Sequence, residues 1–385
     1  MKRSTDRVLT THTGSLPRPA DLLELSRQAR EGAADASALA RRTKEAVDDV
    51  VRRQVASGID VPSDGELSKP SYATYVQHRL SGFEGESERN VRMSDLDEFP
   101  GYGEMLVARR LGARPGGENT VAPPACVADI KVKDLAPLQA DIENLRAAAA
   151  AAKPPEVFMS SASPGVIGLF FANHHYPSRE AYIAAIAEAM RSEYEAIVEA
   201  GFVLQLDCPD LAMGRHFQFA DLGLEDFRRE ARVNVEALNH ATSNIDPDQM
   251  RLHLCWGNYE GPHHRDVPLA EIIDLVLLAR PNGISLEAAN PRHEHEWAIF
   301  EDLALPDGKV LIPGVIDSTN NYIEHPDLVA QRIRRYVGVV GQENVLAGTD
   351  CGFGTAAQIS TVHPEIAFAK LESLAQGARR ASAAD

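Results

Sequence analysis

The stretch SREAYIAAIAEAMRSEYEAIVEAGFVLQLDCPD, residues 178–210, joins a helical pattern to an apolar run and decides the fold. Ser178 is placed to cap the first turn of the helix, and Gly201 is placed to end it. Between them, one helix face carries Tyr182, Ile186, Met190, Tyr194 and Ile197. The run FVLQLD follows at once and has the composition of a buried strand. The stretch therefore predicts one helix that leads into one buried strand.

The same alternation continues along the chain. Eight short apolar runs can be identified: RVLTTH (7–12), GIDVPSDGE (58–66), EVFMSSASP (156–164), FVLQLDCPD (202–210), RLHLCWGN (251–258), GISLEAAN (283–290), KVLIPGVIDS (309–318) and NVLAGTDCG (344–352). Helical patterns separate most of them, including residues 37–58 and 327–340. This order indicates an α/β protein with a parallel sheet. The count of eight favours a closed barrel over an open doubly wound sheet, so we expect residues 1–385 to form a single (β/α)8 TIM barrel.

One part of the chain departs from this alternation. Between the second and third apolar runs, from about residue 67 to 154, the sequence is polar and punctuated by Gly and Pro. It contains one alternating run, CVADIKV (126–132), and then a helical pattern that ends near Ala152. Long connections in compact domains usually carry a function. We therefore expect an insertion between strands 2 and 3, near the barrel mouth, that covers the site or contacts another subunit of a homo-oligomer.

The charge balance limits the classes of partner. The chain has 39 basic and 56 acidic residues and a formal net charge of -17. This excess of negative charge disfavours binding to phosphate backbones or anionic lipid. The start, MKRSTDRVLTTHTGS, has no apolar signal core, and no apolar stretch is long enough to cross a bilayer. Four cysteines in so long a chain do not suggest a disulfide framework. We expect a soluble, cytoplasmic protein that binds neither nucleic acid nor a membrane.

Four side chains at the ends of apolar runs form a candidate metal site. His253 and Cys255 are two residues apart in RLHLCWGN, so in a strand they point the same way. Glu287 and Cys351 each follow a run of their own, and parallel strands of a barrel end at one mouth. Taken alone, each residue is better explained as an ordinary buried or surface residue, but their joint placement at strand ends favours a metal site. Together, two thiolates, an imidazole and a carboxylate suit Zn2+ better than Mg2+ or Ca2+.

The ligand set also predicts a reaction class. A catalytic zinc site admits a substrate atom, and Glu287 is the ligand most easily displaced. A thiol bound at zinc is held as thiolate near neutral pH, which supplies a nucleophile without a general base. The set therefore predicts transfer of an alkyl group to a small-molecule thiol. Zinc-dependent hydrolysis is the rival interpretation, but it more often uses His and carboxylate ligands.

Other polar residues at the same strand ends are candidates for binding the rest of the thiol. Gly14 and Ser15 follow the first run and could bind a carboxylate, while Glu66 and Asp207 could receive an ammonium group. The alternative is that the first two form a turn and that the acids cap helices. Three more residues are near this mouth in sequence, as substrate contacts or as structural hydrogen-bond donors: His12, Arg18 and Lys69.

Histidines elsewhere allow several interpretations. In the loop FFANHHYPS, the residues His174, His175 and Tyr176 could be proton donors or lid residues, or simply a polar loop. The pairs His263–His264 and His293/His295 could suggest a second metal. Because these pairs lie beyond the strand ends in polar loops, we expect solvated histidines there.

On the basis of these residues, the chain resembles the cobalamin-independent methionine synthase family, specifically its zinc-bearing C-terminal barrel. The motifs TTHTGSLPRP, VPSDGE, LQLDCPDL, HLC, SLEAAN, PGVID and TDCGFG occur in the family's order and cover nearly the whole chain. The resemblance implies zinc on His253, Cys255, Glu287 and Cys351. It also implies homocysteine binding by Ser15, Glu66 and Asp207, and direct transfer of a methyl group from a folate to the homocysteine sulfur.

The chain departs from the family in three respects. It has room for one barrel where a full methionine synthase of this kind has two, and Thr319 stands where the family's proton-shuttling His would fall. The aromatic folate platform is not evident in FFANHHYPS. Single-barrel relatives include epoxyalkane:coenzyme M transferases, which open an epoxide with a zinc-bound thiolate. A metal-free lyase like uroporphyrinogen decarboxylase and a noncatalytic zinc protein are further alternatives. We expect zinc-dependent methyl or alkyl transfer to a thiol.

Overall fold

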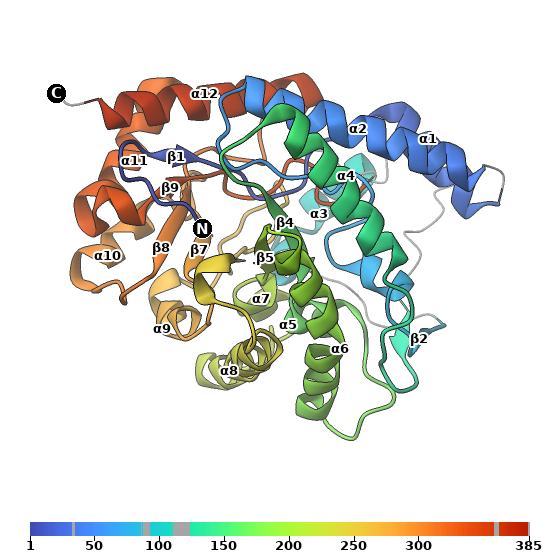
Figure 1. Cartoon of the computed structure of the whole chain (residues 1–385). Helices are drawn as coiled ribbons and strands as arrows, with labels where there is room; N and C mark the ends of the chain where they lie inside the picture. The colour runs from blue at the N-terminus through green and yellow to red at the C-terminus, as the bar shows by residue number, and fades with distance from the viewer. Residues whose placement is uncertain (33–34, 86, 88–92, 111–123, 358–361, 384–385) are drawn as a thin grey trace.

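Five parallel strands form the main sheet of the molecule (Figure 1). They are β4 (Phe158–Ala162), β5 (Val203–Asp207), β6 (Met250–His253), β7 (Gly283–Glu287) and β8 (Val310–Gly314), paired in chain order. The computed structural model describes residues 1–32, 35–85, 87, 93–110, 124–357 and 362–383. Every residue of the five strands is buried, as expected for a parallel sheet covered on both faces. The prediction of an α/β protein with a parallel sheet is confirmed.

Further parallel contacts extend from both edges of this sheet. Strand β9 (Leu346–Ala347) pairs with β1 (Leu9–Thr10). Isolated parallel bridges join the β8 residues to the chain on either side of β9, at Leu311–Val345 and Gly314–Gly348. At the other edge, Thr11 bridges to Val61, and Phe158 N donates to Pro62 O at 3.1 Å. The second apolar run therefore lies between β1 and β4.

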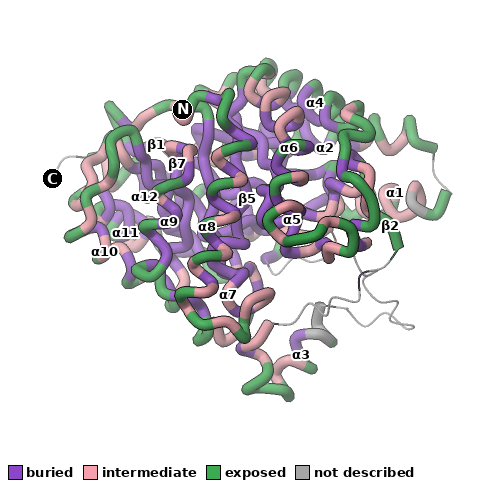
Figure 2. Tube along the Cα trace, turned by 90° about the horizontal axis from the view of Figure 1, so that it is seen from below, coloured by how far each residue is buried: buried purple, intermediate pink, exposed green. Residues whose placement is uncertain are grey.

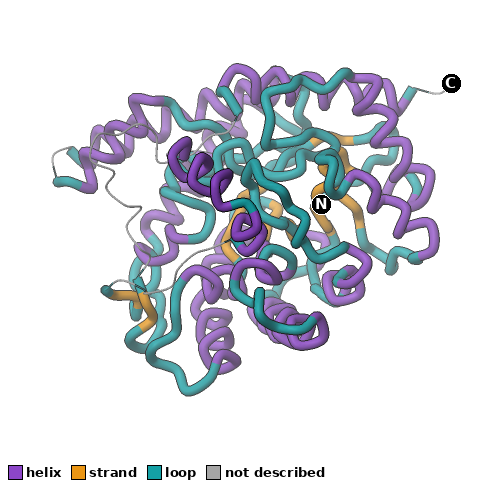
Figure 3. The backbone as a smooth tube through the Cα atoms, turned by 180° about the vertical axis from the view of Figure 1, so that it is seen from behind, coloured by secondary structure: helices purple, strands orange, loops and turns teal. Residues whose placement is uncertain are grey.

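The helices lie outside the strands (Figures 1 and 3). They are α1 (Ala20–Arg30), α2 (Ala36–Ala56), α3 (Pro100–Arg110), α4 (Ala136–Ala152), α5 (Pro164–Phe170), α6 (Arg179–Glu199), α7 (Gly214–Phe217), α8 (Leu224–Ala241), α9 (Ile273–Leu277), α10 (Ile299–Asp302), α11 (Pro326–Val340) and α12 (Pro364–Ser382). Short 3-10 helices are η1 (Thr74–His78), η2 (Ser94–Glu98), η3 (Pro209–Leu211), η4 (Pro247–Gln249), η5 (Leu269–Glu271), η6 (Glu294–Ala298) and η7 (Gln342–Asn344). In the part of the chain that the structure describes, no helix is long and apolar enough to cross a membrane.

Residues 178–210 fold as predicted, as one helix that leads into one buried strand. Ser178 caps α6 by accepting a hydrogen bond from Ala181 N at 3.2 Å. The predicted apolar face is buried against the core. Gly201 follows the helix with φ +86°, a conformation that a residue without a Cβ adopts readily. The patterns at 37–58 and 327–340 correspond to α2 and α11.

The predicted insertion has only a little strand structure. Strand β2 (Phe83–Glu84) pairs antiparallel with β3 (Ala125–Cys126), so only the first residue of CVADIKV lies in a strand. Val132, the last residue of that run, makes an isolated bridge with Leu80. Helix α4 packs beside α2, while α3 stands away from the body of the molecule (Figure 2). Residues 86, 88–92 and 111–123 of the predicted insertion lie outside the described residues.

Candidate metal centre

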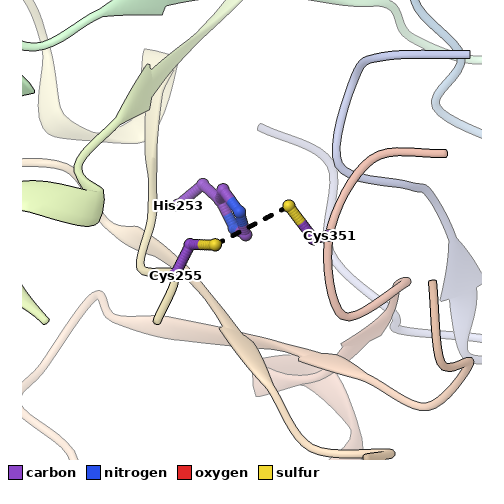
Figure 4. A group of neighbouring side chains, drawn as sticks. All are labelled: His253, Cys255 and Cys351. Carbon is purple, nitrogen blue, oxygen red and sulfur yellow. Dashed lines mark hydrogen bonds between the residues drawn. The ribbon is translucent and has the colours of Figure 1, made fainter. Parts of the chain in front are cut away.

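Three of the four predicted metal ligands lie together at the strand ends (Figure 4). His253 is the last residue of β6, Cys255 follows it, and Cys351 follows β9. The sulfurs of Cys255 and Cys351 are 3.7 Å apart. One ligand atom from each of the three residues lies within 4.8 Å of the others. All three side chains are buried, so this is an enclosed cluster of two thiols and one imidazole.

The free atoms of this cluster suit a metal ion. His253 Nε2 is buried and has no hydrogen-bond partner among the described residues, while Nδ1 is 3.4 Å from Ser285 Oγ. Burial, followed by the nearby Arg251 guanidinium, lowers the pKa of His253 to about 3, so its ring is neutral and keeps a lone pair. The contact with Cys351, together with burial, raises the pKa of the Cys255 thiol. A divalent cation at this position would reverse that shift.

Glu287 adjoins the cluster without being part of the 4.8 Å group. It is the last residue of β7, and its Oε1 accepts a hydrogen bond from Trp256 N at 2.9 Å. Its Oε2 accepts one from Asn290 Nδ2 at 2.7 Å. Burial, followed by the neighbouring Cys255, raises the pKa of Glu287. Each oxygen of the Glu287 carboxyl group therefore accepts one hydrogen bond, and these two bonds hold the group beside the thiols.

The predicted thiol-binding residues lie close to one another, to His253 and to the loop that carries Cys351. A Cβ added to Gly14 would lie 2.8 Å from Glu66 Oε1, and one added to Gly352 would lie 1.9 Å from Ser15 Oγ. Gly14 thus packs against Glu66, and Ser15 packs against the loop that carries Cys351. The structure brings these residues to the same strand ends as the candidate metal ligands.

The two acids of this group are buried together. Glu66 Oε1 accepts from Ser160 Oγ at 2.7 Å, but its Oε2 is buried without a hydrogen-bond partner in the described part of the chain. Asp207 Oδ1 accepts from Gln205 Nε2 at 2.8 Å. Burial, followed by the charge of Glu66, raises the pKa of Asp207. Lys69 and Arg251 act in the opposite direction, and a further cation beside these carboxyl groups would also favour the charged form of Asp207.

His12 and Arg18 make structural hydrogen bonds. The His12 Nε2 atom is 2.7 Å from Gln54 Oε1, and its Nδ1 accepts from Gly14 N at 3.1 Å. Burial, followed by Arg251, lowers the pKa of His12 to about 3. Arg18 donates to three carbonyl oxygens, those of Gly354, Glu66 and Lys69. Both side chains therefore hold the loops that present the candidate substrate residues.

The loop that contains His174, His175 and Tyr176 is tied to the insertion. His175 Nε2 is 3.0 Å from Asp129 Oδ1, and Tyr176 Oη accepts a hydrogen bond from Ile130 N at 2.9 Å. Both histidines are exposed. None of the three belongs to the cluster around the cysteines. These contacts hold the loop against residues 129 and 130 of the insertion.

The expectation of solvated histidines at 263 and 293 is wrong. His293 is 2% exposed and contacts Asp266 and Glu296, while His263 is half-buried and contacts Asp266. Their loops follow different strands and fold against each other, which sequence position alone did not reveal. His264 and His295 are exposed, as expected.

Asp350 is a further site residue that the sequence analysis missed. Its Oδ1 accepts from Ala288 N and Ala289 N, and its Oδ2 accepts from Asn290 N, each at 2.8 Å. Burial, followed by Asp317, raises the pKa of Asp350 to about 7. The carboxyl group fixes the turn after Glu287 against the residue that precedes Cys351. Its position next to that cysteine was the available sequence signal.

Comparisons with known proteins show a family and a similar fold. The family model described as the catalytic domain of cobalamin-independent synthase matches residues 8–105 and 117–371. The methionine synthase of Saccharolobus solfataricus is 23% identical over 373 residues, covering 96% of this chain and 93% of that protein. That of Sulfurisphaera tokodaii is 24% identical over 371 residues, covering 96% and 91%. A B12-independent methionine synthase from Shewanella sp. W3-18-1, solved in complex with selenomethionine, has a similar fold, with TM-score 0.73, 19% identity and 97% of each chain covered.

Proposed function

Because the chain belongs to the cobalamin-independent methionine synthase family, we propose that it is a zinc-dependent enzyme that transfers a methyl group to the sulfur of a small thiol. Family membership and the names of its relatives support methyl transfer of the methionine synthase type. The observation that carries the zinc proposal is the buried pair of cysteine sulfurs, 3.7 Å apart, beside an imidazole nitrogen without a partner. Zinc favours such a set of sulfur and nitrogen donors.

The proposed ligands are His253, Cys255, Cys351 and Glu287. The first three already converge, and Glu287 is the neighbouring oxygen donor that a substrate thiol would most easily replace. When bound, zinc would lower the pKa of a thiol so that its sulfur is a thiolate at neutral pH. The protein residues exclude water from the sulfurs, because all four side chains are buried.

We assign the thiol's other end to the acids and the loop at Gly14 and Ser15. Glu66 and Asp207 would receive an ammonium group, which would donate to the unpaired Glu66 oxygen and would favour the charged form of Asp207. Gly14 and Ser15 would bind a carboxylate. An amino-acid thiol such as homocysteine fits these charges. A sulfonated thiol such as coenzyme M would place a negative group near two acids, which disfavours epoxide opening by that thiol.

The methyl donor is constrained by Thr319. Its N–H and its hydroxyl both donate to Asp317 Oδ1 at 2.7 Å, so this side chain stabilises a turn. A hydroxyl group used in this way cannot deliver a proton to a leaving nitrogen. The proposed donor is therefore one that leaves without such help, and His174, His175 and Tyr176 act as covering residues of the mouth.

The sheet contacts support a single closed (β/α)8 barrel as the scaffold of this site. The bridges from β8 to β9, from β1 to Val61 and from Pro62 to β4 connect successive runs around a ring of eight. Residues 1–385 would then form one barrel, with the insertion at about 67–154 near its mouth.

The proposal is tested by following a labelled methyl group from a donor to homocysteine. Zinc-depleted protein is expected to be inactive and to recover when zinc is restored, with magnesium as the control metal. Full methyl transfer by the zinc-depleted protein would contradict zinc dependence, and no methyl transfer by zinc-loaded protein with any donor would contradict the proposed reaction.

A further inference from the structure

A largely buried group of titratable residues contacts Trp256, the residue that follows the candidate ligand Cys255. We call it the histidine cluster, and it consists of His216, His263, His293, Asp266 and Glu296. Asp266 is at its centre: its Oδ2 is 2.8 Å from His263 Nδ1 and 3.0 Å from His293 Nε2. Its Oδ1 is 3.3 Å from His216 Nδ1. The methyl-transfer reaction proposed above does not use any of these residues.

The contacts of His293 fix its charge. Its Nδ1 is 2.8 Å from Glu296 Oε2, and its Nε2 is 3.0 Å from Asp266 Oδ2. Carboxylate oxygens only accept hydrogen bonds, so both ring nitrogens must donate and the ring is an imidazolium. Burial alone would lower the pKa of His293, but the bonds to Asp266 and Glu296 outweigh it and raise the pKa to about 10.

The imidazolium contacts the candidate metal centre through Trp256. The two rings are stacked, with centroids 4.1 Å apart and an angle of 28° between the planes. A cation against the face of an indole is attracted by the negative face of the ring. The indole is also held at its edge, where Nε1 donates to Val267 O at 2.7 Å.

Trp256 in turn holds two of the proposed ligands. It directly follows Cys255, and its backbone N donates to Glu287 Oε1 at 2.9 Å. A displaced indole would therefore shift both a thiol and a carboxylate. Glu296 is itself anchored, because its Oε1 accepts from Leu269 N at 2.7 Å. The path from the histidine cluster to the ligands thus consists of fixed contacts at every step.

We propose that His293 is a positioning residue of the metal centre, which clamps the indole of Trp256 and so fixes Cys255 and Glu287 in their binding geometry. This inference rests on the proposed function for the identity of the metal. Outer contacts of this kind orient metal ligands and commonly account for 10–100-fold in affinity. A purely structural role would stabilise the loops without changing the affinity of folded protein for zinc.

The test compares His293→Gln with His295→Gln, which changes an exposed histidine two residues away. Zinc affinity is measured on folded protein by competition with a chelator. His293→Gln is expected to bind zinc about 10–100-fold more weakly, and the control is expected to match the wild type. The loss should shrink when Trp256→Leu is already present, because His293 acts through that indole. Equal affinity of His293→Gln and wild type would overturn the inference while the proposed function stands.

A second measurement does not depend on metal. The chain has two tryptophans, so in a Trp297→Phe background the near-UV circular dichroism of metal-free protein reports on Trp256. His293→Gln is expected to reduce this signal, and an unchanged signal would overturn the inference even if the wild type bound no zinc. If His293→Gln does not fold, Glu296→Gln, which removes one of the two carboxylates, should show the same effects to a smaller degree. Wild-type affinity and an unchanged signal in Glu296→Gln would overturn the inference.

Discussion

The two sides of the site are built differently. On the metal side, His253, Cys255 and Cys351 offer uncharged or weakly acidic atoms, and the surrounding contacts hold them in place. On the thiol side, Glu66 and Asp207 present two buried carboxyl groups, and the charge of Glu66 raises the pKa of Asp207. The metal side suits a cation that binds sulfur, and the thiol side suits an ammonium group. The comparison indicates that metal binding and thiol recognition can be changed separately.

The largest expected effect comes from removing a sulfur on the metal side. Cys255→Ala and Cys351→Ala should each weaken zinc binding by more than about 100-fold, since changes outside the ligand set already cost 10–100-fold. The fold should persist, because each cysteine is one small side chain in a large core. Metal analysis and far-UV circular dichroism check this. Full zinc content in both variants would show that neither cysteine is needed to hold the metal. The division into a metal side and a thiol side would then be wrong.

A second prediction concerns the donor that approaches the metal side. An acid placed at a leaving group is typically worth about 10²–10⁴ in rate, and the Thr319 hydroxyl is already engaged by Asp317. We expect little or no turnover with methylfolate polyglutamate. Turnover should be better with an activated donor such as a methylcorrinoid, a sulfonium or an epoxide. Rates are compared at saturating thiol, and methylfolate as the fastest donor would show that another acid serves the site.

The thiol side should respond to neutral replacements of its acids. Glu66→Gln and Asp207→Asn are each expected to weaken homocysteine binding by about 1.5–3 kcal/mol, the range for hydrogen bonds to charged groups. Zinc content should not change. Thiols without an amino group should be much less affected, and calorimetry with both kinds of thiol makes the comparison. Equal losses for both kinds would mean that the acids do not recognise the ammonium group.

The histidine cluster gives the smallest effect, a pH dependence of stability. The pKa of His293 is raised from 6.5 to about 10, so its stabilising contribution is complete below pH 6.5 and is lost as the pH rises through 10. Urea unfolding of metal-free protein should show wild type more stable than His293→Gln at pH 6.5, with a smaller difference at pH 10. A difference that grows with pH would show that the ring is neutral in the folded protein.

Local patterns in the sequence predicted the elements of the fold. The spacing from Ser178 to Gly201 gave the helix that the structure shows, because capping and amphipathic periodicity are properties of neighbouring residues. The convergence of His253, Cys255 and Cys351 also followed from the rule that parallel strands end at one mouth. The alternating run CVADIKV enters a strand only at its first residue, because its partner β2 has two residues.

Contacts between loops could not be predicted in this way. His293 and Asp266 are 27 residues apart and meet only because two loops fold against each other. Asp350 likewise reaches the turn after Glu287 across more than 60 residues. His12 and Arg18 were open to two interpretations, and their partners, Gln54 Oε1 and three carbonyl groups, became visible only in three dimensions.

The central claim is that one site holds both a zinc ion and the substrate sulfur. Zinc-edge X-ray absorption of the wild-type protein, recorded before and after addition of homocysteine, tests it most directly. We expect two sulfur ligands before addition, from Cys255 and Cys351, and a third sulfur afterwards that replaces an oxygen ligand. A zinc spectrum that homocysteine leaves unchanged, or purified protein that binds no zinc, would contradict the claim.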